Sequence, residues 1–361
     1  MDAAIKFLLT CIYFYLNIYQ FFIAKLNFKA IKIFTMKKIS QISTQLFLSK
    51  LMLQLIVLLL AVAVTSANDI RLQKSGDPSI EGRWDMTINE SGKQVPSWFE
   101  VTHSGVHTLV GQFVGAGGSS RPVSRVNFSD GKLSFTLPPQ WEPESNDITV
   151  EGVLQGETLS GTIVGSDGKR YNWVAERAPS LRRQTQPVWG KQIKLFSGTD
   201  LTGWHAMGVN QWVAKSGVLS SPHSGANLVT DKTFTDFKLH IEFKYPKGSN
   251  SGVYLRGRYE VQVADSKGLE PLKDQLGAIY GFISPTEMVA KAAGEWQTYD
   301  ITLAGRMVTV VANGVTVICN QEIPGITGGA IDSKEGEAGP LLIQGDHGPV
   351  EYRNIMITPA K

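Results

Sequence analysis

Alternation of apolar and polar residues is the clearest pattern in the second half of the chain. In residues 251–265 (SGVYLRGRYEVQVAD) one parity is apolar: Val253, Leu255, Tyr259, Val261 and Val263. The other parity carries planar hydrogen-bonding groups: Tyr254, Arg256, Arg258, Glu260 and Gln262. Successive side chains of a strand point to opposite faces. The pattern therefore predicts one strand with a core face and a polar face.

The stretch FKLHIEFKY, residues 237–245, repeats this alternation. Its polar parity holds His240, Glu242 and Lys244, so two strands are expected to present polar side chains on one face. The outer face of a sandwich sheet is ordinarily polar, which explains such a row without any function. Tyr, Arg, Glu and Gln, however, combine planar bodies with paired hydrogen-bonding groups, which suits the hydroxyl edges and C–H faces of sugars.

Short strands separated by turns fill residues 80–178. Asp130-Gly131 and Asp167-Gly168 stand between apolar runs, a strong hairpin signal. Residues 68–180 are therefore expected to form a small antiparallel β-meander, closed or half-closed into a barrel. Four tryptophans fall in this part and are interpreted as core residues or, alternatively, as a sugar platform: Trp84, Trp98, Trp141 and Trp173.

Residues 181–190 contain proline and polar residues and are interpreted as a linker. The many strand-like segments of residues 191–361 predict a two-sheet sandwich of the jelly-roll type. Residues 265–290 interrupt that rhythm and are expected to form a long loop with a short helix. The fold class is therefore all-β, a small β domain followed by a jelly-roll β-sandwich.

The N-terminal 67 residues read as a leader. Residues 46–64 are an apolar run that follows Lys37 and Lys38 and precedes small residues, which is typical of a secretory signal peptide cleaved after Ala67. Residues 1–35 are interpreted as an upstream extension before a true start at Met36; a membrane hairpin is the alternative. The mature chain is expected to be exported and periplasmic, envelope-associated or secreted, with no membrane span.

Charge changes the picture once the leader is set aside. Residues 1–67 hold seven Lys and one Asp, a charge of +6, whereas the whole chain carries +3, so residues 68–361 carry −3. No basic patch remains that would indicate nucleic-acid binding. Cys319 is the one cysteine after the leader, which excludes an internal disulfide, and it is expected to be a core residue.

A second concentration of polar residues lies in IQGDHGPVEYRNIMI, residues 343–357. Gln344, Asp346 and His347 stand among glycines at the end of a strand. His347 beside Asp346 is interpreted as an oriented base or a metal ligand. A turn stabilised by the aspartate, with an exposed histidine, is the alternative.

Several blocks of the second half together resemble the 3-keto-disaccharide hydrolase domain family, over about residues 191–359. The resemblance is carried by KLFSGTDLTGW (194–204), QWVAKSGVL (211–219), NLVTDKTFTDFKLHIEFK (227–244), NSGVYLRGRYEVQVADS (250–266), GEWQTYDI (294–301), NGV (313–315) and IQGDHGPVEYRNIMI (343–357). It implies a concanavalin-like jelly-roll and hydrolysis of glycosides that carry a ketone at sugar carbon 3. The family's motif residues map to Asn250, Arg256, Glu260, Gln262, Asp265, Gln344, His347 and Arg353.

A ketone at carbon 3 acidifies the proton on carbon 2, so a base can form an enolate that expels the group on carbon 1, after which water adds back. Glu260 and His347 are the expected base and acid, in either order, and Arg256 is expected to stabilise the enolate. The expected substrate-binding residues are Asn250, Tyr254, Gln262, Asp265, Gln344 and Arg353. A divalent cation could replace Arg256, and Asp265 could orient His347 or join a metal site.

Two other functions stay open. A non-catalytic carbohydrate-binding module could use the same scaffold. A laminarinase-like glycoside hydrolase would need closely paired carboxylates, and Gln262 stands where the second would be wanted. The ligand expected in each case is a saccharide; the 3-keto reading also implies an upstream sugar 3-oxidase as a pathway partner.

Overall fold

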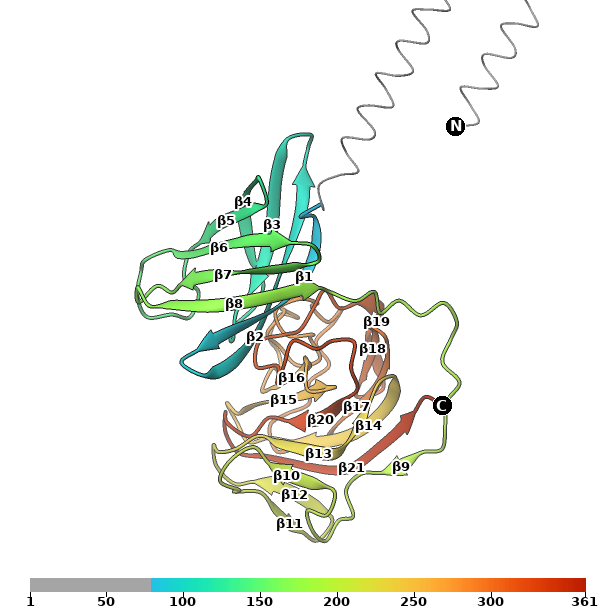
Figure 1. The fold of residues 1–361 in the computed structure, drawn as a ribbon. Helices are drawn as coiled ribbons and strands as arrows, with labels where there is room; N and C mark the ends of the chain where they lie inside the picture. The colour runs from blue at the N-terminus through green and yellow to red at the C-terminus, as the bar shows by residue number, and fades with distance from the viewer. Residues whose placement is uncertain (1–78) are drawn as a thin grey trace, which may run out of the picture. The chain divides into compact units, whose positions relative to one another are not determined.

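The computed structural model describes residues 79–361, which form β-strands joined by turns and loops (Figure 1). The predicted leader, signal peptide and start site fall in residues 1–67 and lie outside this range. Within residues 79–361 no helix is long and apolar enough to cross a membrane. The all-β prediction is confirmed.

The first eight strands form a closed antiparallel barrel in sequence order. Strand β8 closes it by pairing with β1, with Trp84 opposite Arg177. Asp130 and Gly131 make the β4–β5 hairpin turn with positive φ angles of 51° and 71°, as the Asp-Gly signal predicted. The strands are β1 (Gly82–Glu90), β2 (Lys93–Ser104), β3 (Thr108–Val114), β4 (Arg121–Ser129), β5 (Lys132–Leu137), β6 (Ile148–Gln155), β7 (Thr158–Val164) and β8 (Arg170–Arg177).

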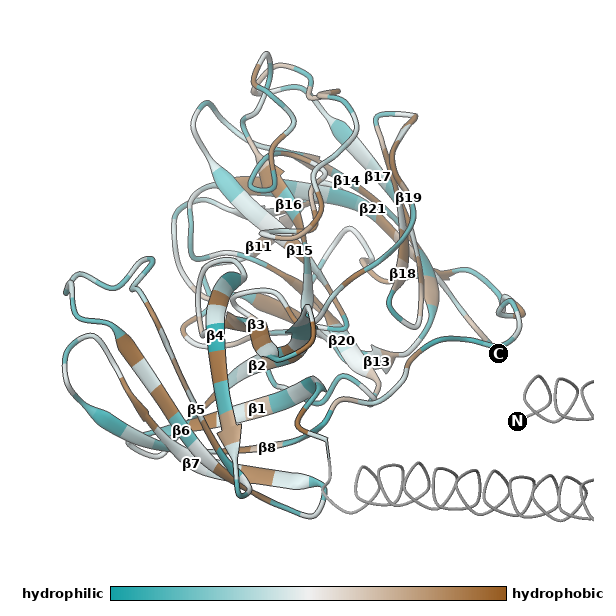
Figure 2. Cartoon of the chain, turned by 90° about the horizontal axis from the view of Figure 1, so that it is seen from above, coloured by the Kyte–Doolittle hydropathy of each residue, from teal (hydrophilic) through white to brown (hydrophobic). Residues whose placement is uncertain are grey.

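Inward-facing apolar side chains fill the barrel. Hydrophobic and hydrophilic bands alternate along its strands in Figure 2, as expected where one face is buried. Phe99 lies at the centre, with ring-centroid distances of 6.4 Å to Trp84 and 6.1 Å to Trp173. Around Phe99 the interior of the barrel is therefore a packed hydrophobic core and not an open channel.

The remaining strands form two antiparallel sheets of a sandwich, consistent with a jelly-roll. The five-stranded sheet has the order β10 (Trp204–Ala206), β13 (Leu228–Phe234), β20 (Gly339–Ile343), β15 (Asn250–Leu255), β16 (Tyr259–Ala264). The other has the order β11 (Val213–Lys215), β12 (Val218–Ser221), β21 (Val350–Pro359), β14 (Phe237–Lys244), β17 (Gln297–Ala304), β18 (Met307–Ala312), β19 (Val315–Glu322), with β9 (Ile193–Lys194) pairing to β21.

Residues 251–265 form a hairpin and not the single predicted strand. The chain turns at Arg256, Gly257 and Arg258, and Arg256 and Gly257 adopt positive φ angles of 56° and 65°. Because the loop between Leu255 and Tyr259 contains three residues, even positions still face even positions across the hairpin. The strand residues of the hairpin therefore keep the predicted apolar and polar faces, although the prediction of a single strand was wrong.

The two polar rows lie on different sheets, which corrects the expectation of one shared face. His240, Glu242 and Lys244 belong to β14 of the larger sheet, whereas Tyr254 and Glu260 belong to β15 and β16 of the five-stranded sheet. Residues 265–290 form turns without the expected helix, and part of this loop runs beside β16, where Gln262 N–H donates to the Ala278 carbonyl at 2.9 Å. Cys319 is exposed on β19 and not in the core.

The barrel and the sandwich belong to one compact unit, Pro78–Lys361. Trp98 of β2 points out of the barrel and joins the hydrophobic core of the sandwich, where it is 1% exposed. Its indole N–H donates to the Ile326 carbonyl at 2.8 Å, and its ring lies 5.9 Å from that of Phe282. Burying a tryptophan contributes on the order of 2–3 kcal/mol, so Trp98 anchors the two domains to each other.

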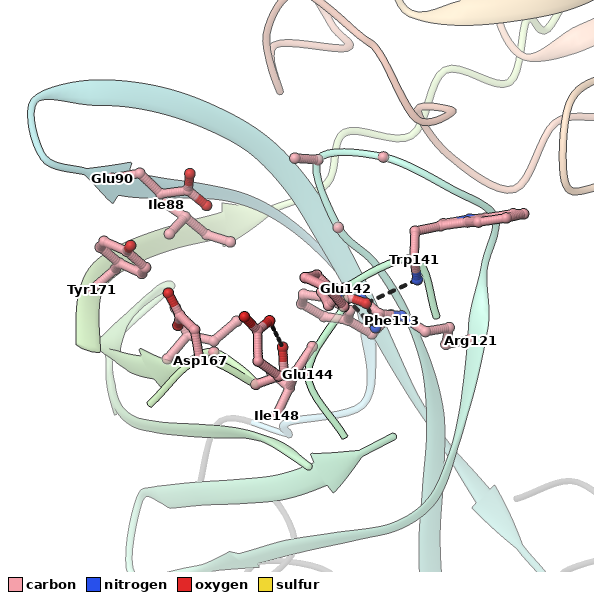
Figure 3. A pocket seen from close by; sticks show the side chains of 17 residues that line it. Ile88, Glu90, Phe113, Arg121, Trp141, Glu142, Glu144, Ile148, Asp167 and Tyr171 are labelled. Carbon is pink, nitrogen blue, oxygen red and sulfur yellow. Dashed lines mark hydrogen bonds and ion pairs between the residues drawn. The ribbon is translucent and has the colours of Figure 1, made fainter. Parts of the chain in front are cut away.

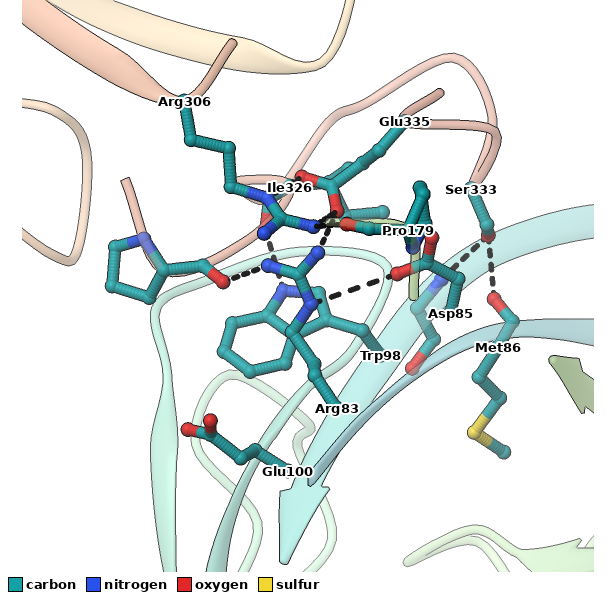
Figure 4. Close-up of polar contacts among 12 residues, drawn as sticks. Arg83, Asp85, Met86, Trp98, Glu100, Pro179, Arg306, Ile326, Ser333 and Glu335 are labelled. Carbon is teal, nitrogen blue, oxygen red and sulfur yellow. Dashed lines mark hydrogen bonds and ion pairs between the residues drawn. The ribbon is translucent and has the colours of Figure 1, made fainter. Parts of the chain in front are cut away.

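A buried polar network surrounds this anchor (Figure 4). Glu335 of the sandwich accepts hydrogen bonds from Arg83 of β1 and from Arg306, the latter at 2.9 Å. Asp85 lies 3.7 Å from Arg83. Burial, and next the negative charge of Glu335, raise the pKa of Asp85 to about 7. The barrel is thus held by buried charges as well as by Trp98.

Candidate functional site

Six of the nine predicted site residues come together around one hollow of about 200 Å³ on the polar side of the five-stranded sheet. They are Asn250, Tyr254, Glu260, Gln262, Gln344 and His347. The hairpin β15–β16 supplies the first four, and the loop after β20 supplies Gln344 and His347. Two segments almost a hundred residues apart thus meet because β20 pairs with β15.

Glu260 and Tyr254 are direct cross-strand neighbours. The Tyr254 hydroxyl lies 2.8 Å from Glu260 Oε2 and 3.1 Å from the Gly328 carbonyl oxygen, so it can donate its single hydrogen to either. Gly252 leaves room for the glutamate, because a Cβ there would overlap the carboxylate. A Cβ at Gly329 would lie 2.5 Å from the tyrosine hydroxyl. Two glycines therefore leave room for the Glu260 carboxyl group and the Tyr254 hydroxyl close to the backbone.

Glu260 is only 4% exposed, and among residues 79–361 no cationic side chain forms a hydrogen bond with it. Burial disfavours its charged form and raises its pKa to about 8, although the Tyr254 hydrogen bond and the nearby His347 act in the opposite direction. At neutral pH the side chain is therefore mostly a carboxylic acid. A carboxylic acid that keeps its proton at this pH is suited to donate it.

His347 is oriented by its sequence neighbour. Its Nδ1 lies 2.6 Å from Asp346 Oδ1, which leaves Nε2 as the free ring nitrogen. This hydrogen bond is the main reason that the pKa of His347 is raised above its ordinary value of 6.5. The loop is held from both sides: Ser224 Oγ donates to the Asp346 carbonyl at 2.5 Å, and Gly345 N–H donates to Asn227 Oδ1 at 2.8 Å. The arrangement is that of an oriented base.

Two buried acceptors in the hollow have no protein partner. Asn250 Oδ1 and Gln344 Oε1 make no hydrogen bond within the described structure. Leaving a buried polar atom unpaired costs about 1–3 kcal/mol, so such atoms point to a ligand that supplies donors. Gln262, by contrast, is fixed: its amide nitrogen donates to the Asp274 carbonyl at 3.2 Å and its oxygen accepts from Val263 N–H. Hydroxyl groups of a sugar are donors of the required kind.

Arg256 lies outside this hollow, contrary to the expectation that it stabilises an enolate. It occupies the hairpin turn, is 1% exposed, and donates to the Tyr259 hydroxyl at 2.8 Å and to the Gly305 carbonyl at 3.0 Å. Its neighbour Arg258 forms a two-point ion pair with Asp332 at 2.7 and 3.1 Å. Arg256 therefore fastens its own hairpin to the turn between β17 and β18, and Arg258 fastens it to the segment around Asp332. Strand alternation did not predict this because side chains in a turn leave the faces of the strand.

Arg353 and Asp265 also lie elsewhere. Arg353 is on β21 of the larger sheet, where its Nε donates to Glu242 at 2.7 Å and its guanidinium carbon lies 3.9 Å from the centre of the Trp296 ring. Asp265 follows β16 and accepts the Gly248 N–H at 2.9 Å. Neither residue lines the hollow, so a direct role in substrate binding is not supported for either.

The site also contains residues that sequence reasoning did not select. Asn227, Tyr280, Gly328 and Gly329 come from three other segments of the sandwich, and residues 116–118 come from the barrel. Glycines carry no functional group that would have signalled them. The barrel residues are brought in by a contact between domains, for which the sequence holds no local signal.

The part of the chain that the structure describes contains no preformed cluster of metal-ligating side chains. Residues 79–361 contain no group of three or more His, Cys, Asp or Glu side chains placed to hold a metal ion. In the hollow, Asp346 is bonded to His347 and Glu260 to Tyr254.

A second hollow, of about 420 Å³, lies at one end of the barrel (Figure 3). Glu90, Glu144 and Asp167 line it together with Tyr171, and Arg121 pairs there with Glu142 at 3.2 Å. Of its carboxylates, only that of Glu142 lies in an ion pair with a basic lining residue. Among the described residues, no histidine and no buried carboxyl group line this hollow, so it lacks the acid–base pair of the smaller hollow.

Fold and site together define an all-β protein, a barrel followed by a sandwich, in which a buried acid and an aspartate-oriented histidine line the same hollow. Residues 191–358, a segment of the chain, match the family described as the 3-keto-alpha-glucoside-1,2-lyase-like domain. That segment is accordingly a 3-keto-disaccharide hydrolase-like domain, as the sequence resemblance indicated.

Solved structures with similarity include two from Parabacteroides distasonis, each provisionally described as a glycosyl hydrolase. One is 29% identical, with a TM-score of 0.41, and the match covers 50% of this chain and 96% of that one. The other is 25% identical, with a TM-score of 0.38, covering 46% and 98%. The carbohydrate-binding module CBM66 from Bacillus subtilis is 10% identical, with a TM-score of 0.33, covering 44% and 97%. Because these scores lie below 0.5, the assignment rests on the family match. No curated protein matches the chain.

Proposed function

We propose that this protein cleaves glycosides whose sugar carries a ketone at carbon 3. The observation that carries the proposal is the buried Glu260, with its pKa raised to about 8, in the same hollow as the His347–Asp346 pair. An acid and a base with different environments are what an elimination across carbons 1 and 2 requires. The family description, which refers to a 1,2-lyase, supports the same chemistry.

His347 acts as the base in this proposal. Its Nε2 takes the proton from carbon 2, and the electron pair of that C–H bond forms an enolate with the carbon 3 ketone. Asp346 holds the ring in place through Nδ1 and stabilises the imidazolium that results. Donors that line the hollow, such as the hydroxyl of Tyr280, replace Arg256 as stabilisers of the enolate oxygen.

Glu260 acts as the acid. The enolate re-forms the ketone, a double bond forms between carbons 1 and 2, and the carbon 1–oxygen bond breaks with its electrons on oxygen. Glu260 supplies the proton to that oxygen, so the leaving group departs as a neutral alcohol. Water then adds across the double bond: its hydroxyl bonds to carbon 1 while Glu260 takes its proton, and His347 returns its proton to carbon 2. Both residues regain their starting protonation states, and the net reaction is a hydrolysis. Asn250 and Gln344 accept hydrogen bonds from sugar hydroxyls. A 3-oxidation must precede this step.

The test is release of a chromogenic leaving group from a β-glucoside and from its 3-keto form, each with and without a chelator. We expect release from the keto form alone, and a loss of about 10²–10⁴-fold on Glu260→Gln or His347→Ala. Arg353→Gln, which alters the other sheet, is the matched control and should retain activity.

Each other outcome points to a different function. Release from the unoxidised glucoside would favour an ordinary glycoside hydrolase and contradict the elimination mechanism. Sugar binding without release from either substrate would favour a carbohydrate-binding module. Loss of activity with the chelator would add a metal ion to the electrophilic role.

A further inference from the structure

The barrel contributes a wall to the catalytic hollow. Residues 115–120, the loop between β3 and β4, are wedged between two glycine-bearing loops of the sandwich. The Gly329 N–H donates to the Ala116 carbonyl at 3.0 Å. A Cβ on Gly328 would lie 2.6 Å from the Gly118 carbonyl oxygen, and one on Gly281 would overlap Ser119. Such close backbone approach is possible only with glycine, so the two domains fit closely at the site itself.

Trp141 stands directly beside this loop. A Cβ on Gly118 would overlap its indole ring. The backbone around Trp141 is fixed, because Glu142 accepts the N–H groups of Gln140 and Trp141 at 2.7 and 3.0 Å. Gln140 in turn donates to Ser119 Oγ at 2.8 Å. The two barrel loops therefore form one rigid support for the tryptophan.

The indole of Trp141 is nonetheless 70% exposed, unlike Trp84, Trp98 and Trp173, which are buried. Trp141 also lines the barrel-end hollow, and in Figure 3 its ring extends away from Glu144 and Asp167. A large aromatic ring held rigidly in water forgoes on the order of 2 kcal/mol of burial, which a stacked ligand would recover. Apolar ring faces of this kind are suited to the C–H face of a sugar.

Trp141 lines a groove of about 410 Å³. Tyr280 lines both the groove and the hollow, so the two adjoin at this residue. Leu272 supplies a further apolar group to the groove, and Lys273 and Ser284 supply hydrogen-bonding groups. The catalytic hollow, at about 200 Å³, is smaller than the roughly 300–1,000 Å³ of pockets that enclose a drug-sized ligand. Part of a disaccharide must therefore lie outside it.

We infer that this groove is the subsite for the leaving sugar, with Trp141 stacking on its ring. The inference rests on the proposed function, because it places the leaving sugar of a disaccharide in the groove while the 3-keto ring occupies the hollow. It makes the barrel part of the active site and a determinant of specificity for disaccharides over glycosides with a small leaving group. The sugar hydroxyls would meet Lys273 and Ser284.

The test compares the 3-keto form of a glucosyl disaccharide with the 3-keto form of methyl glucoside. Trp141→Ala in the full chain should lower kcat/KM for the disaccharide about tenfold, the effect of losing one stacking contact. It should leave kcat/KM for the methyl glycoside within about twofold. Trp141→Phe, which keeps an aromatic face, should retain most of the disaccharide activity.

Trp296→Ala is the control, because it removes an indole of the same size from beside the larger sheet. An equal loss for both substrates in Trp141→Ala would show that the tryptophan only supports the loop, and no loss for either would also overturn the subsite. Calorimetric titration of the keto disaccharide into Glu260→Gln, with and without Trp141→Ala, measures binding at the subsite while turnover is slowed. Failure of the proposed function would instead appear as no cleavage of either substrate by the unchanged protein.

Discussion

At the scale of single residues, the chemistry depends on two side chains whose pKa values are shifted by different causes. Burial raises the pKa of Glu260 to about 8, and the hydrogen bond that His347 Nδ1–H donates to Asp346 raises the pKa of His347 above 6.5. His347 must lose its proton to become a competent base, and Glu260 loses its acid proton as pH passes about 8. The active form is the one with neutral His347 and protonated Glu260.

The expected result is a bell-shaped pH dependence of kcat/KM for the keto substrate. Its acidic limb should lie above 6.5 and its alkaline limb near 8, and both limbs belong to the coupled pair. The residual activity of Glu260→Gln should lose the alkaline limb, because an amide does not titrate. A Glu260→Gln profile with the alkaline limb intact would assign that limb to another group.

The alternation in residues 251–265 correctly predicted which side chains share a face, and the length of one turn explains why. Tyr254, Glu260 and Gln262 share a face because three residues separate the strands; a two-residue loop would have placed them apart. Arg256 was misplaced for the same reason, since it lies in that turn. Sequence alternation predicts faces reliably only while the chain remains a strand.

At the scale of elements, the loops between strands bring the site together. The barrel loop 115–120, the loop around Gly328 and the loop after β20 all line the hollow, and they belong to segments far apart in the chain. Their approach is limited by backbone atoms and not by flexible side chains. The geometry should therefore be sensitive to one added methyl group.

Gly328→Ala tests this sensitivity. The new Cβ would lie 2.6 Å from the Gly118 carbonyl oxygen, so the loops must separate. We expect the free energy of unfolding to fall by about 1–3 kcal/mol, as for other overpacked sites, and thermal unfolding would measure it. Gly117→Ala is the matched control within the barrel loop, because a Cβ there meets nothing within 4 Å. Equal unfolding midpoints for the two variants would mean that the loops are not in tight contact.

At the scale of the whole molecule, the barrel and sandwich act as one unit because Trp98 and a buried charged network join them. Within that network the pKa of Asp85 is raised from 3.8 to about 7. A carboxyl group with a raised folded-state pKa stabilises the fold fully below its unfolded value, and this stabilisation is lost as pH rises through the folded value. The interface should therefore weaken between about pH 4 and pH 7.

Asp85→Asn should remove this part of the pH dependence. Denaturant unfolding at about pH 5 and about pH 7 should show a smaller difference in the variant than in the unchanged protein. Glu260 contributes in the same direction through its own raised pKa, so Glu260→Gln and the double variant separate the two contributions. An unchanged pH dependence in Asp85→Asn would show that Asp85 does not lose its proton in this range.

The sequence by itself determined the all-β class, a small β-meander followed by a sandwich, and six of the residues that line the hollow. These depend on short-range patterns, namely period-two alternation, Asp-Gly turns and the motif around His347. Only the tertiary structure decided that Arg256 fastens a loop, that Arg353 lies on the other sheet, and that the barrel borders the site. The reason is physical. Contacts between the barrel and the sandwich, and between a sheet and the loops over it, depend on the complementary shapes of segments far apart in the chain, and such complementarity produces no periodic sequence pattern.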